Sequence, residues 1–448
     1  MKIIHIPYCF YPDPVGGTEV YVKNLCASLK EFGVESLVAA PTDGQSADYI
    51  HEGLRVRRFS ISKKIEDLSD IYGGSDPVAS KIFGRILDEE KPDLAHFHAL
   101  TYAVSLDLAR ESRSRGIPAV FTYHTPTVSC QSGLLMIWKK QVCKGFLNAR
   151  ICATCTLYRF NIPRGVADIL AIFPSCLGRL IKRLHLKGRI FTALRIRCLI
   201  EQRIKLIEDF IKEVDHLIVL CRWTKELLLR NKAPLSRISL VRHGVAQAEF
   251  SKTDNAIDNV AADSRPLKIA YLGRIDWTKG VDKVIKALKQ MPEEAIELDV
   301  YGVAQGRNAD KYFGKLKRFV KQNDNRIKFL APVPNARAIS LLKKYHYLVI
   351  PSIWMETGPL VALEAFGAGT PVIGSDLGGI KELVQNHENG ILVPIGSVNA
   401  WRDVLKKVSR DRELLKKLRQ GVKPPRTMLD VAREIVPIYN SLISGQQI

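Results

Sequence analysis

Residues 351–365 read PSIWMETGPLVALEA, and this stretch passes from the end of a short apolar run into a helical pattern. The apolar run, residues 347–351, has the length of a buried strand. Gly358 allows close backbone approach, and Pro359 suits the first turn of a helix. A helix that starts at the carboxyl end of a buried strand presents free N–H groups to a phosphate. The stretch therefore predicts an open α/β sheet with an anion site at this turn.

The rest of the chain repeats this alternation of short apolar runs and helical patterns, which is typical of parallel sheets covered by helices. At 448 residues the chain exceeds what one hydrophobic core usually supports, so we expect two doubly wound, Rossmann-like α/β domains facing across a cleft. The predicted strands are residues 2–7, 35–40, 93–98, 118–123 and 216–221 in the first domain, and 267–272, 297–301, 326–330, 347–351 and 371–374 in the second.

The predicted organisation has four parts. A first domain covers residues 1–248, and a polar linker with no apolar periodicity covers residues 249–266. A second domain covers residues 267–425, and a C-terminal helix over residues 426–448 packs back on the first domain.

Composition and charge exclude several classes of protein. The 46% apolar and 25% charged residues are ordinary for a globular chain and argue against disorder. No run of about 18 apolar residues occurs, and the apolar start is too short for a secretory signal, so we expect a cytoplasmic protein without a spanning helix. The net charge of +21 is concentrated, because residues 131–205 hold fifteen Lys and Arg against Asp168 and Glu201.

Two carboxylates and two cations stand out around predicted strand ends of the second domain. Glu356 and Glu364 are separated by seven residues, and carboxylates accept hydrogen bonds from paired hydroxyls, such as those of a sugar or a ribose. Residues 271–280, YLGRIDWTKG, again pass from strand to loop to helix, and they carry Arg274 and Lys279. Two fixed cations neutralise a diphosphate. Each pair alone is more often solvent-facing, but together they favour a site.

A third loop, residues 12–19 with the sequence PDPVGGTE, follows the first predicted strand. Gly16 and Gly17 offer bare N–H groups before a helix, which suits a phosphate or a sugar. A double glycine by itself more often marks a plain turn.

These three elements resemble the retaining glycosyltransferases of family 4, which have the GT-B fold. The resemblance covers nearly the whole chain, including GAGTPVIG at residues 367–374, Gly378-Gly379 and Asn389-Gly390. It implies an enzyme that uses a UDP- or GDP-sugar, retains the anomeric configuration and needs no divalent metal or other cofactor for catalysis. Because the sequence shows no clearly placed nucleophile, we expect same-face substitution in which the leaving phosphate helps to deprotonate the acceptor hydroxyl.

The resemblance also implies roles for particular residues. Arg274 and Lys279 would contact the donor diphosphate, Glu356 the transferred sugar and Glu364 the ribose. His124, in the sequence FTYHTP at residues 121–126, would lie beside the transferred sugar; His98 is a weaker candidate, because a strand-end histidine is more often structural. The remaining donor-binding positions are Gly16, Gly17, Val333 near the base, Thr357, Gly358, Pro359 and Leu360.

Two departures from the family pattern concern sugar identity. Thr125 follows His124 where many members have an acidic residue, and Thr357-Gly358-Pro359 stands where many have Gly-Phe-Gly. The resemblance therefore carries over the phosphate site but leaves the sugar open.

Residues 125–210 interrupt the alternating pattern and hold four cysteines. Cys152 and Cys155 have the spacing of a tetrahedral zinc site, which Cys130 and Cys143 would complete. Unpaired thiols are an equal alternative, and redox or disulfide chemistry is a third.

The second part of this insert interleaves Leu and Ile with Lys and Arg over residues 177–203. Basic amphipathic helices of this kind settle on anionic membrane surfaces, and a solvated helix pair is the alternative. A peripheral position on the inner face of the cell membrane would suit a lipid-linked acceptor.

The sequence thus predicts transfer of a sugar to a lipid-linked or polysaccharide acceptor in surface glycan or glycolipid biosynthesis. A nucleotide-sugar epimerase of the same fold is one alternative, which the motif from Glu356 to Glu364 disfavours. A non-catalytic, membrane-associated scaffold is another, but it would be expected to have lost Arg274 and Lys279. Nucleic-acid binding is not expected, because aromatic residues are sparse among the basic residues of the insert.

Overall fold

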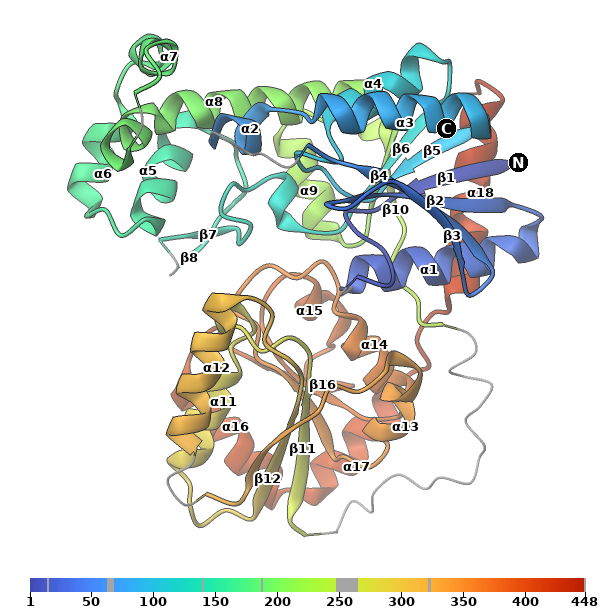
Figure 1. Cartoon of the computed structure of the whole chain (residues 1–448). Coiled ribbons are helices and arrows are strands. Elements are labelled where there is room, and N and C mark those ends of the chain that lie inside the picture. The colour runs from blue at the N-terminus through green and yellow to red at the C-terminus, as the bar shows by residue number, and fades with distance from the viewer. Residues whose placement is uncertain are drawn as a thin grey trace. The chain divides into compact units, whose positions relative to one another are not determined.

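The computed structural model describes residues 1–13, 16–62, 68–138, 141–186, 188–246, 265–320 and 324–446. The predicted linker, residues 249–266, lies outside these residues except for Arg265 and Pro266. The chain divides into two compact units (Figure 1). Unit 1 consists of Met1–Arg242 and Val431–Ile448, and unit 2 of His243–Asp430.

Unit 1 is built on an eight-stranded sheet with the order β10-β9-β6-β5-β1-β2-β4-β3. Neighbouring strands are parallel except for β3, which pairs antiparallel with β4. The strands are β1 (Lys2–Ile6), β2 (Glu35–Thr42), β3 (Ala47–His51), β4 (Leu54–Ser60), β5 (Leu94–Phe97), β6 (Ala119–Tyr123), β9 (His216–Val219) and β10 (Ile238–Leu240).

Helices cover both faces of this sheet, so strands such as β5 and β6 are buried along their whole length. Figure 1 shows α3, α4 and α8 over one face and α1 over the other. The helix α18 contributes Tyr439, a fully buried residue that bonds to His96 of β5. The main helices are α1 (Gly17–Leu29), α3 (Pro77–Glu90), α4 (Leu106–Ser114), α8 (Arg189–Glu213), α9 (Arg222–Arg230) and α18 (Met428–Ile443).

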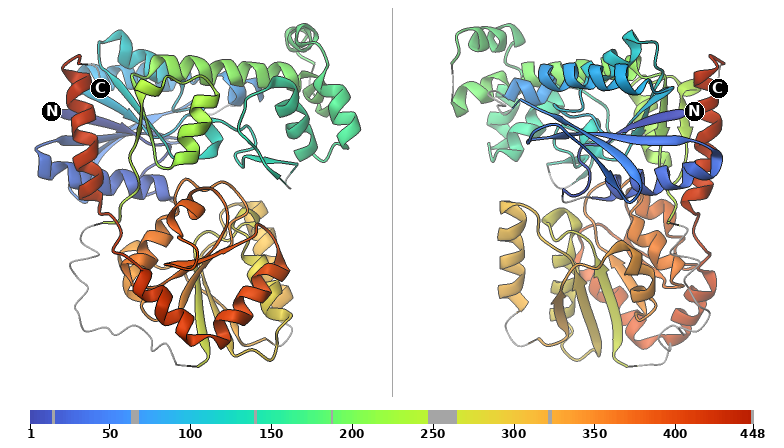
Figure 2. Two further views of the ribbon diagram at one scale, coloured as in Figure 1. Left: turned by 180° about the vertical axis from the view of Figure 1, so that it is seen from behind. Right: turned by 45° about the vertical axis from the view of Figure 1, so that its right-hand side comes forward.

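The insert between β6 and β9 forms a small helical body at one end of α8, which both views in Figure 2 show. Leu157, Ile196 and Leu199 of the insert share an apolar core with Tyr72 of α2 (Leu68–Gly73). No helix among the described residues is both long and apolar enough to cross a lipid bilayer. The elements of the insert are β7 (Met136–Ile137), β8 (Gln141–Val142), α5 (Ala149–Arg159), α6 (Arg164–Ala171), α7 (Ser175–Arg183) and α8.

Unit 2 is built on a parallel six-stranded sheet with the order β13-β12-β11-β14-β15-β16. Buried side chains pack on both of its faces, with Ile269 and Val300 in one cluster and Ala270 and Leu348 in the other. The strands are β11 (Leu267–Leu272), β12 (Ile296–Tyr301), β13 (Ile327–Leu330), β14 (Tyr347–Ile350), β15 (Val372–Ser375) and β16 (Gly390–Val393), and the helices are α11 (Val281–Lys289), α12 (Arg307–Val320), α13 (Ala338–Leu342), α14 (Leu360–Gly367), α15 (Gly378–Leu383), α16 (Val398–Arg410) and α17 (Arg412–Gly421).

The predicted α/β class with two Rossmann-like domains is confirmed. Each of the ten predicted strands is present within a residue or two of its expected limits. The prediction missed β3, β4, β10 and β16, as well as the short hairpin of β7 and β8. The boundary of unit 1 falls at Arg242, whereas the sequence pattern placed it at residue 248.

Candidate active site

The strand order of unit 2 locates a binding position before any side chain is considered. From β11 the chain continues to β12 and β13 on one side, and then crosses to β14 on the other side. Ligands of doubly wound sheets bind outside the carboxyl ends of the strands at such a switch point. The loop after β11 carries Arg274 and Lys279, and the loop after β14 carries Glu356. The two loops that sequence analysis singled out therefore flank the switch point.

Lys279 and Glu356 form an ion pair across these two loops. The Lys279 Nζ lies 2.6 Å from Glu356 Oε1. The side chains are 18% and 9% exposed, so water screens this pair only weakly. The ammonium also lies 5.2 Å from the ring centroid of Trp354. Lys279 and Glu356 are 77 positions apart in the sequence, yet their side chains are in direct contact.

Two further side chains hold the carboxylate of Glu356. The Ser352 hydroxyl donates to Oε1 over 2.8 Å, and the Trp354 indole N–H donates to the same oxygen over 2.9 Å. Residues 352, 354 and 356 alternate along the sequence, and the side chains of the first two meet the carboxylate of the third. Sequence analysis missed Ser352 and Trp354, although this alternation, read backwards from Glu356, could have identified them.

The charge state of Glu356 follows from these contacts. Burial favours the neutral acid, but the charge of Lys279 and the hydrogen bonds from Lys279, Ser352 and Trp354 outweigh it, so the pKa of the Glu356 carboxyl lies below its usual value. The side chain is thus an ionised hydrogen-bond acceptor in a buried position. An acceptor of this kind suits the hydroxyl groups of a sugar.

Close backbone packing ties the two loops together. Gly280 has a φ of +68°, and a Cβ atom there would lie 2.0 Å from the carbonyl oxygen of Pro351. The amide of Ile353 donates to the carbonyl of Thr278 over 2.8 Å. Only glycine fits this approach, which explains the residue that follows Lys279 in the sequence.

The segment 356–358 rests on the start of α15. Gly379 donates its N–H to the carbonyl of Glu356 over 2.7 Å, and a Cβ at Gly379 would lie 2.5 Å from the nitrogen of Gly358. On another side, a Cβ at Gly358 would lie 3.1 Å from the ring of His243. Burial lowers the pKa of His243 to about 4, so the ring is neutral at pH 7.

The other predicted donor-binding residues of unit 2 lie in varied environments. Glu364 is buried on the first turns of α14, and Thr357 is buried in the preceding loop. Arg274 is exposed, and Val333 is half-buried in the loop that follows β13. Pro359 is the N-cap of α14, which begins at Leu360 as expected for a helix start at this turn.

In unit 1, the expectation of bare N–H groups at Gly16 and Gly17 is wrong for Gly16. The helix α1 begins at Gly17, and the Gly16 N–H donates over 2.7 Å to the side chain of Glu19. A buried carboxylate of the protein thus already accepts the hydrogen bond of the Gly16 N–H. The spacing Gly16-x-x-Glu19 is that of a capping box and could have predicted this contact.

His124 lies just past β6 and is buried. Its Nε2 is 3.0 Å from Nδ1 of His98, and its ring packs edge-on against Tyr21 with 4.8 Å between centroids. His98 is itself fully enclosed, and it was only a secondary candidate in the sequence.

The four cysteines of the insert come together from three segments. Charge on Cys130, Cys143 or Cys155 would act on Cys152, and burial raises the pKa of that thiol to about 11. Among the described residues, however, the group of three potential ligands within 4.8 Å of one another is His5, His96 and His98, and no three cysteine sulfurs form such a group. Metal binding by the cysteines would thus require the segments to move closer together.

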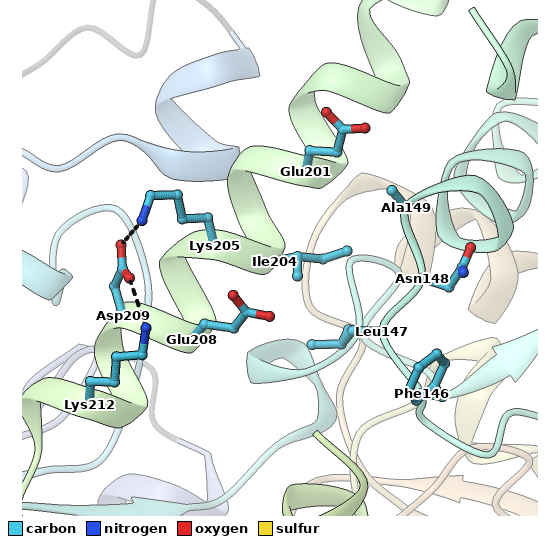
Figure 3. Close-up of a pocket in the computed structure, with 10 residues that line it drawn as sticks. All are labelled: Phe146, Leu147, Asn148, Ala149, Glu201, Ile204, Lys205, Glu208, Asp209 and Lys212. Atoms are coloured by element: carbon cyan, nitrogen blue, oxygen red, sulfur yellow. Dashed lines mark hydrogen bonds and ion pairs between the residues drawn. The ribbon is translucent and has the colours of Figure 1, made fainter. Parts of the chain in front are cut away.

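A shallow pocket of about 420 Å³ lies along α8 in unit 1 (Figure 3). Asp209 bonds to Lys205 and Lys212 along its wall. Its lining residues, which include Phe146 and Glu208, contain none of the predicted site residues.

Two sequence profiles of known families match this chain, one within each unit. A sequence profile described as glycosyl transferases group 1 matches residues 252–423, and one described as glycosyltransferase family 4 matches residues 15–155.

Individual relatives are distant. A D-inositol 3-phosphate glycosyltransferase of Corynebacterium glutamicum is 30% identical over 258 residues, which are 52% of this chain and 60% of that protein. The chain spans about half the length of the curated relatives it matches.

Solved structures share the fold. Sucrose-phosphate synthase from Thermosynechococcus elongatus is 17% identical with a TM-score of 0.67, and all of both chains is covered. HepE of Anabaena in complex with UDP is 16% identical with a TM-score of 0.62, covering 98% of this chain and 100% of that chain.

Proposed function

Because the chain belongs to the glycosyltransferases that these two profiles describe, we propose that it transfers a sugar from a nucleoside-diphosphate sugar to an acceptor hydroxyl, with retention of anomeric configuration and without a metal ion. The observation that carries this proposal is the pair of Lys279 and Glu356 at the switch point of unit 2. A partly buried ammonium and a buried carboxylate side by side match the two halves of such a donor, one anionic and one rich in hydroxyls.

In this proposal the residues of unit 2 bind and orient the donor. Lys279 and Arg274 neutralise the diphosphate, and the first amides of α14 add partial positive charge. Negative charge grows on the phosphate oxygen as its bond to the sugar breaks, and fixed cations stabilise that charge without rearranging. Glu356 accepts hydrogen bonds from the sugar, and Glu364 accepts them from the ribose.

His124 lies in unit 1 and is proposed to contact the transferred sugar. The leaving phosphate takes the proton of the acceptor hydroxyl as the new bond forms on the same face of the sugar. Since no protein nucleophile is invoked, this same-face substitution accounts for retention.

A screen of UDP- and GDP-sugars tests the activity. We expect one nucleotide sugar to raise the Tm of the wild-type protein and to be hydrolysed slowly, in buffer with EDTA as well as without it. The anomeric configuration of the transferred sugar, read by NMR, should match that of the donor. If no donor shifts the Tm and none is turned over, the proposed activity is wrong.

The acceptor is proposed to be lipid-linked, on the strength of the surface of the insert. Of 23 large apolar side chains exposed in the described residues, ten lie between residues 151 and 190: Ile151, Phe160, Val166, Ile169, Ile172, Leu177, Leu180, Leu184, Leu186 and Ile190. The helices α6 and α7 bury small residues such as Ala167, Ala171 and Gly178 while larger ones face outward. A concentration of exposed large apolar side chains in one short segment is typical of an interaction surface.

Exposed basic side chains are interleaved with these apolar residues in the sequence. Arg164, Arg179, Lys182, Arg183 and Arg189 are exposed on α6, α7 and the start of α8. Exposed apolar side chains interleaved with basic ones match a leaflet of anionic lipids, where each Lys or Arg contributes about 1 kcal/mol. We therefore propose peripheral binding to the inner face of the cell membrane, which would bring a lipid-linked acceptor to the enzyme for surface glycan or glycolipid synthesis.

Replacing Leu177, Leu180 and Leu184 together by serine should weaken binding to anionic vesicles at least tenfold, or about 1.4 kcal/mol. All three side chains are exposed, so the fold should tolerate the change. Co-sedimentation with phosphatidylserine-containing vesicles measures the effect.

The matched control replaces Ile50, Leu229 and Leu235 by serine, since these are equally exposed apolar residues of unit 1 outside the insert. This control should bind like the wild type. Equal loss in both variants, or equal wild-type binding to uncharged vesicles, would contradict a specific basic and apolar membrane surface.

We also propose that Cys130, Cys143, Cys152 and Cys155 hold a structural zinc ion. The N–H of Gly145 donates to the sulfur of Cys143 over 3.4 Å, a contact that stabilises a thiolate. Burial and neighbouring thiols raise the pKa of Cys155, and a dication would offset that cost.

The protein purified without chelators should then contain about one zinc ion per chain by elemental analysis. The double variant Cys152→Ser, Cys155→Ser should lose the metal, whereas Cys176→Ser, an exposed cysteine outside the group, should keep it. A metal-free wild type would leave the four residues as free thiols.

A further inference from the structure

A chain of three histidines leads from the core of unit 1 to His124. His5 on β1, His98 just past β5 and His124 just past β6 come from adjacent strands of the sheet. Nδ1 of His5 lies 3.1 Å from Nε2 of His98, and Nδ1 of His98 lies 3.0 Å from Nε2 of His124. His5 and His98 are almost completely buried. Two hydrogen-bond contacts therefore connect His5 to His124 through His98.

The histidine chain ends at His5. Nε2 of His5 is buried and has no hydrogen-bond partner among the described residues. His96 packs its ring against His98 with 4.0 Å between centroids, and its own nitrogens bond to Tyr439 and Thr122. Five of the six ring nitrogens of His5, His96 and His98 are thus engaged in hydrogen bonds. This arrangement is that of a hydrogen-bonded network and not of a metal centre.

The rings of His5 and His98 are neutral at physiological pH. Burial lowers the pKa of His5 to about 3. Burial and the neighbouring rings of His96, His124 and His5 hold the pKa of His98 well below its usual value. A neutral imidazole has one N–H and one acceptor nitrogen, so each bond in the chain has a single donor.

Only two proton arrangements satisfy both bonds when His124 is neutral. In the first, His124 donates to His98 and His98 donates to His5, which leaves the proton of His5 on its buried Nε2. In the second, His5 donates to His98 and His98 donates to His124, which leaves a bare lone pair on Nε2 of His5. In proteins, a buried N–H group without a hydrogen-bond partner is rarer than a buried acceptor without one. The second arrangement is therefore favoured, and in it the proton of His124 is on Nδ1.

We infer that His98, backed by His5, is a positioning residue that fixes His124 as the Nδ1–H tautomer and so makes it a neutral hydrogen-bond donor to an oxygen of the bound sugar. The inferred tautomer follows from the hydrogen bonds among His5, His98 and His124 and does not depend on the proposed activity. Its effect on turnover rests on the function proposed above. The two parts can therefore fail separately.

NMR of the protein labelled with ¹⁵N-histidine tests the tautomer. The His124 signals are assigned by their loss in His124→Asn. We expect Nε2 of His124 in the wild type to be the unprotonated, pyridine-type nitrogen and Nδ1 to carry the proton. A proton on Nε2 in the wild type would overturn the inference without the need for any further variant.

Variants at His98 test its role. In His98→Asn the amide nitrogen takes the place of Nδ1 and donates to His124, so the tautomer should persist. In His98→Asp the carboxylate only accepts, so Nε2 of His124 should gain a proton. Turnover should then fall about 100-fold in His98→Asp, while His98→Asn should keep most of the wild-type turnover.

The control is His216→Asn, which changes another buried histidine of the same sheet, bonded to Ser239 outside the network. It should leave both the His124 tautomer and the turnover as in the wild type. If His98→Asp moves the proton but turnover does not change, the tautomer is as inferred and the assigned role of His124 in transfer is wrong. If the proton does not move in His98→Asp, His98 does not position His124.

Discussion

Replacing Lys279 with alanine should lower kcat/KM for the nucleotide-sugar donor by about 100- to 1,000-fold, or about 2.7–4 kcal/mol. The reason is that the ammonium stabilises charge which appears on the leaving diphosphate only as the sugar bond breaks. The measurement is the rate of donor hydrolysis or transfer with the nucleotide sugar found in the screen. Lys283→Ala is the matched control, since Lys283 lies on the neighbouring helix α11 and pairs with Asp282.

The same substitution should also destabilise unit 2, because it leaves the buried carboxylate of Glu356 without its cation. Loss of one partner of a buried pair costs about 3–5 kcal/mol. The double variant Lys279→Ala, Glu356→Gln removes that charge while Ser352 and Trp354 can still donate to the amide oxygen. Its Tm should recover and its activity should not. If Lys279→Ala, once folded, turned over donor within threefold of the wild type, the proposed role of Lys279 would be wrong.

Replacing Gly379 with alanine should weaken donor binding at least tenfold, or about 1.4 kcal/mol. The new Cβ would meet the nitrogen of Gly358 at 2.5 Å and the carbonyl carbon of Thr357 at 2.7 Å. Both atoms are backbone, so the segment 356–358 must move, and the donor-binding amides move with it. Overpacking of this kind also costs about 1–3 kcal/mol of stability. Calorimetry with the nucleotide sugar measures the affinity.

Gly314→Ala provides the comparison. Gly314 lies within α12, and nothing lies within 4 Å of a Cβ built there. This variant should bind the donor normally and gain up to about 1 kcal/mol of stability, because alanine favours the helix. Equal affinity in Gly379→Ala and Gly314→Ala would show that the segment 356–358 does not form part of the donor site.

The sequence predicted most strands of both sheets from local apolar patterns, and it missed β4 because charged residues interrupt that pattern. The strand β4 (Leu54–Ser60) reads LRVRRFS, and its arginines conceal the pattern of a buried strand. Arg58 is nevertheless buried there, because it donates to the carbonyls of Phe10 and Pro41 and pairs with Asp13. Such compensation depends on residues distant in the sequence, so a local pattern cannot reveal it.

The candidate site shows the same division. Each loop of unit 2 could be identified from its own residues, since a strand, a turn and a helix start are local features. That Lys279 bonds directly to Glu356 could not be predicted, because it depends on the order of β11 and β14 in the sheet. The histidine chain was missed for a similar reason: His5, His98 and His124 meet only when the register of three strands is known.

The helix α18 has a consequence for how the protein is made. It belongs to unit 1, yet the ribosome synthesises it only after all of unit 2. Until then, His96 of β5 lacks its contact with Tyr439, and the part of β5 that Tyr439 covers is uncovered. Domains generally fold in the order of their synthesis. In this chain the unit that is begun first is completed last, so a nascent chain stalled within residues 243–430 would carry an unfinished N-terminal sheet, open to chaperones.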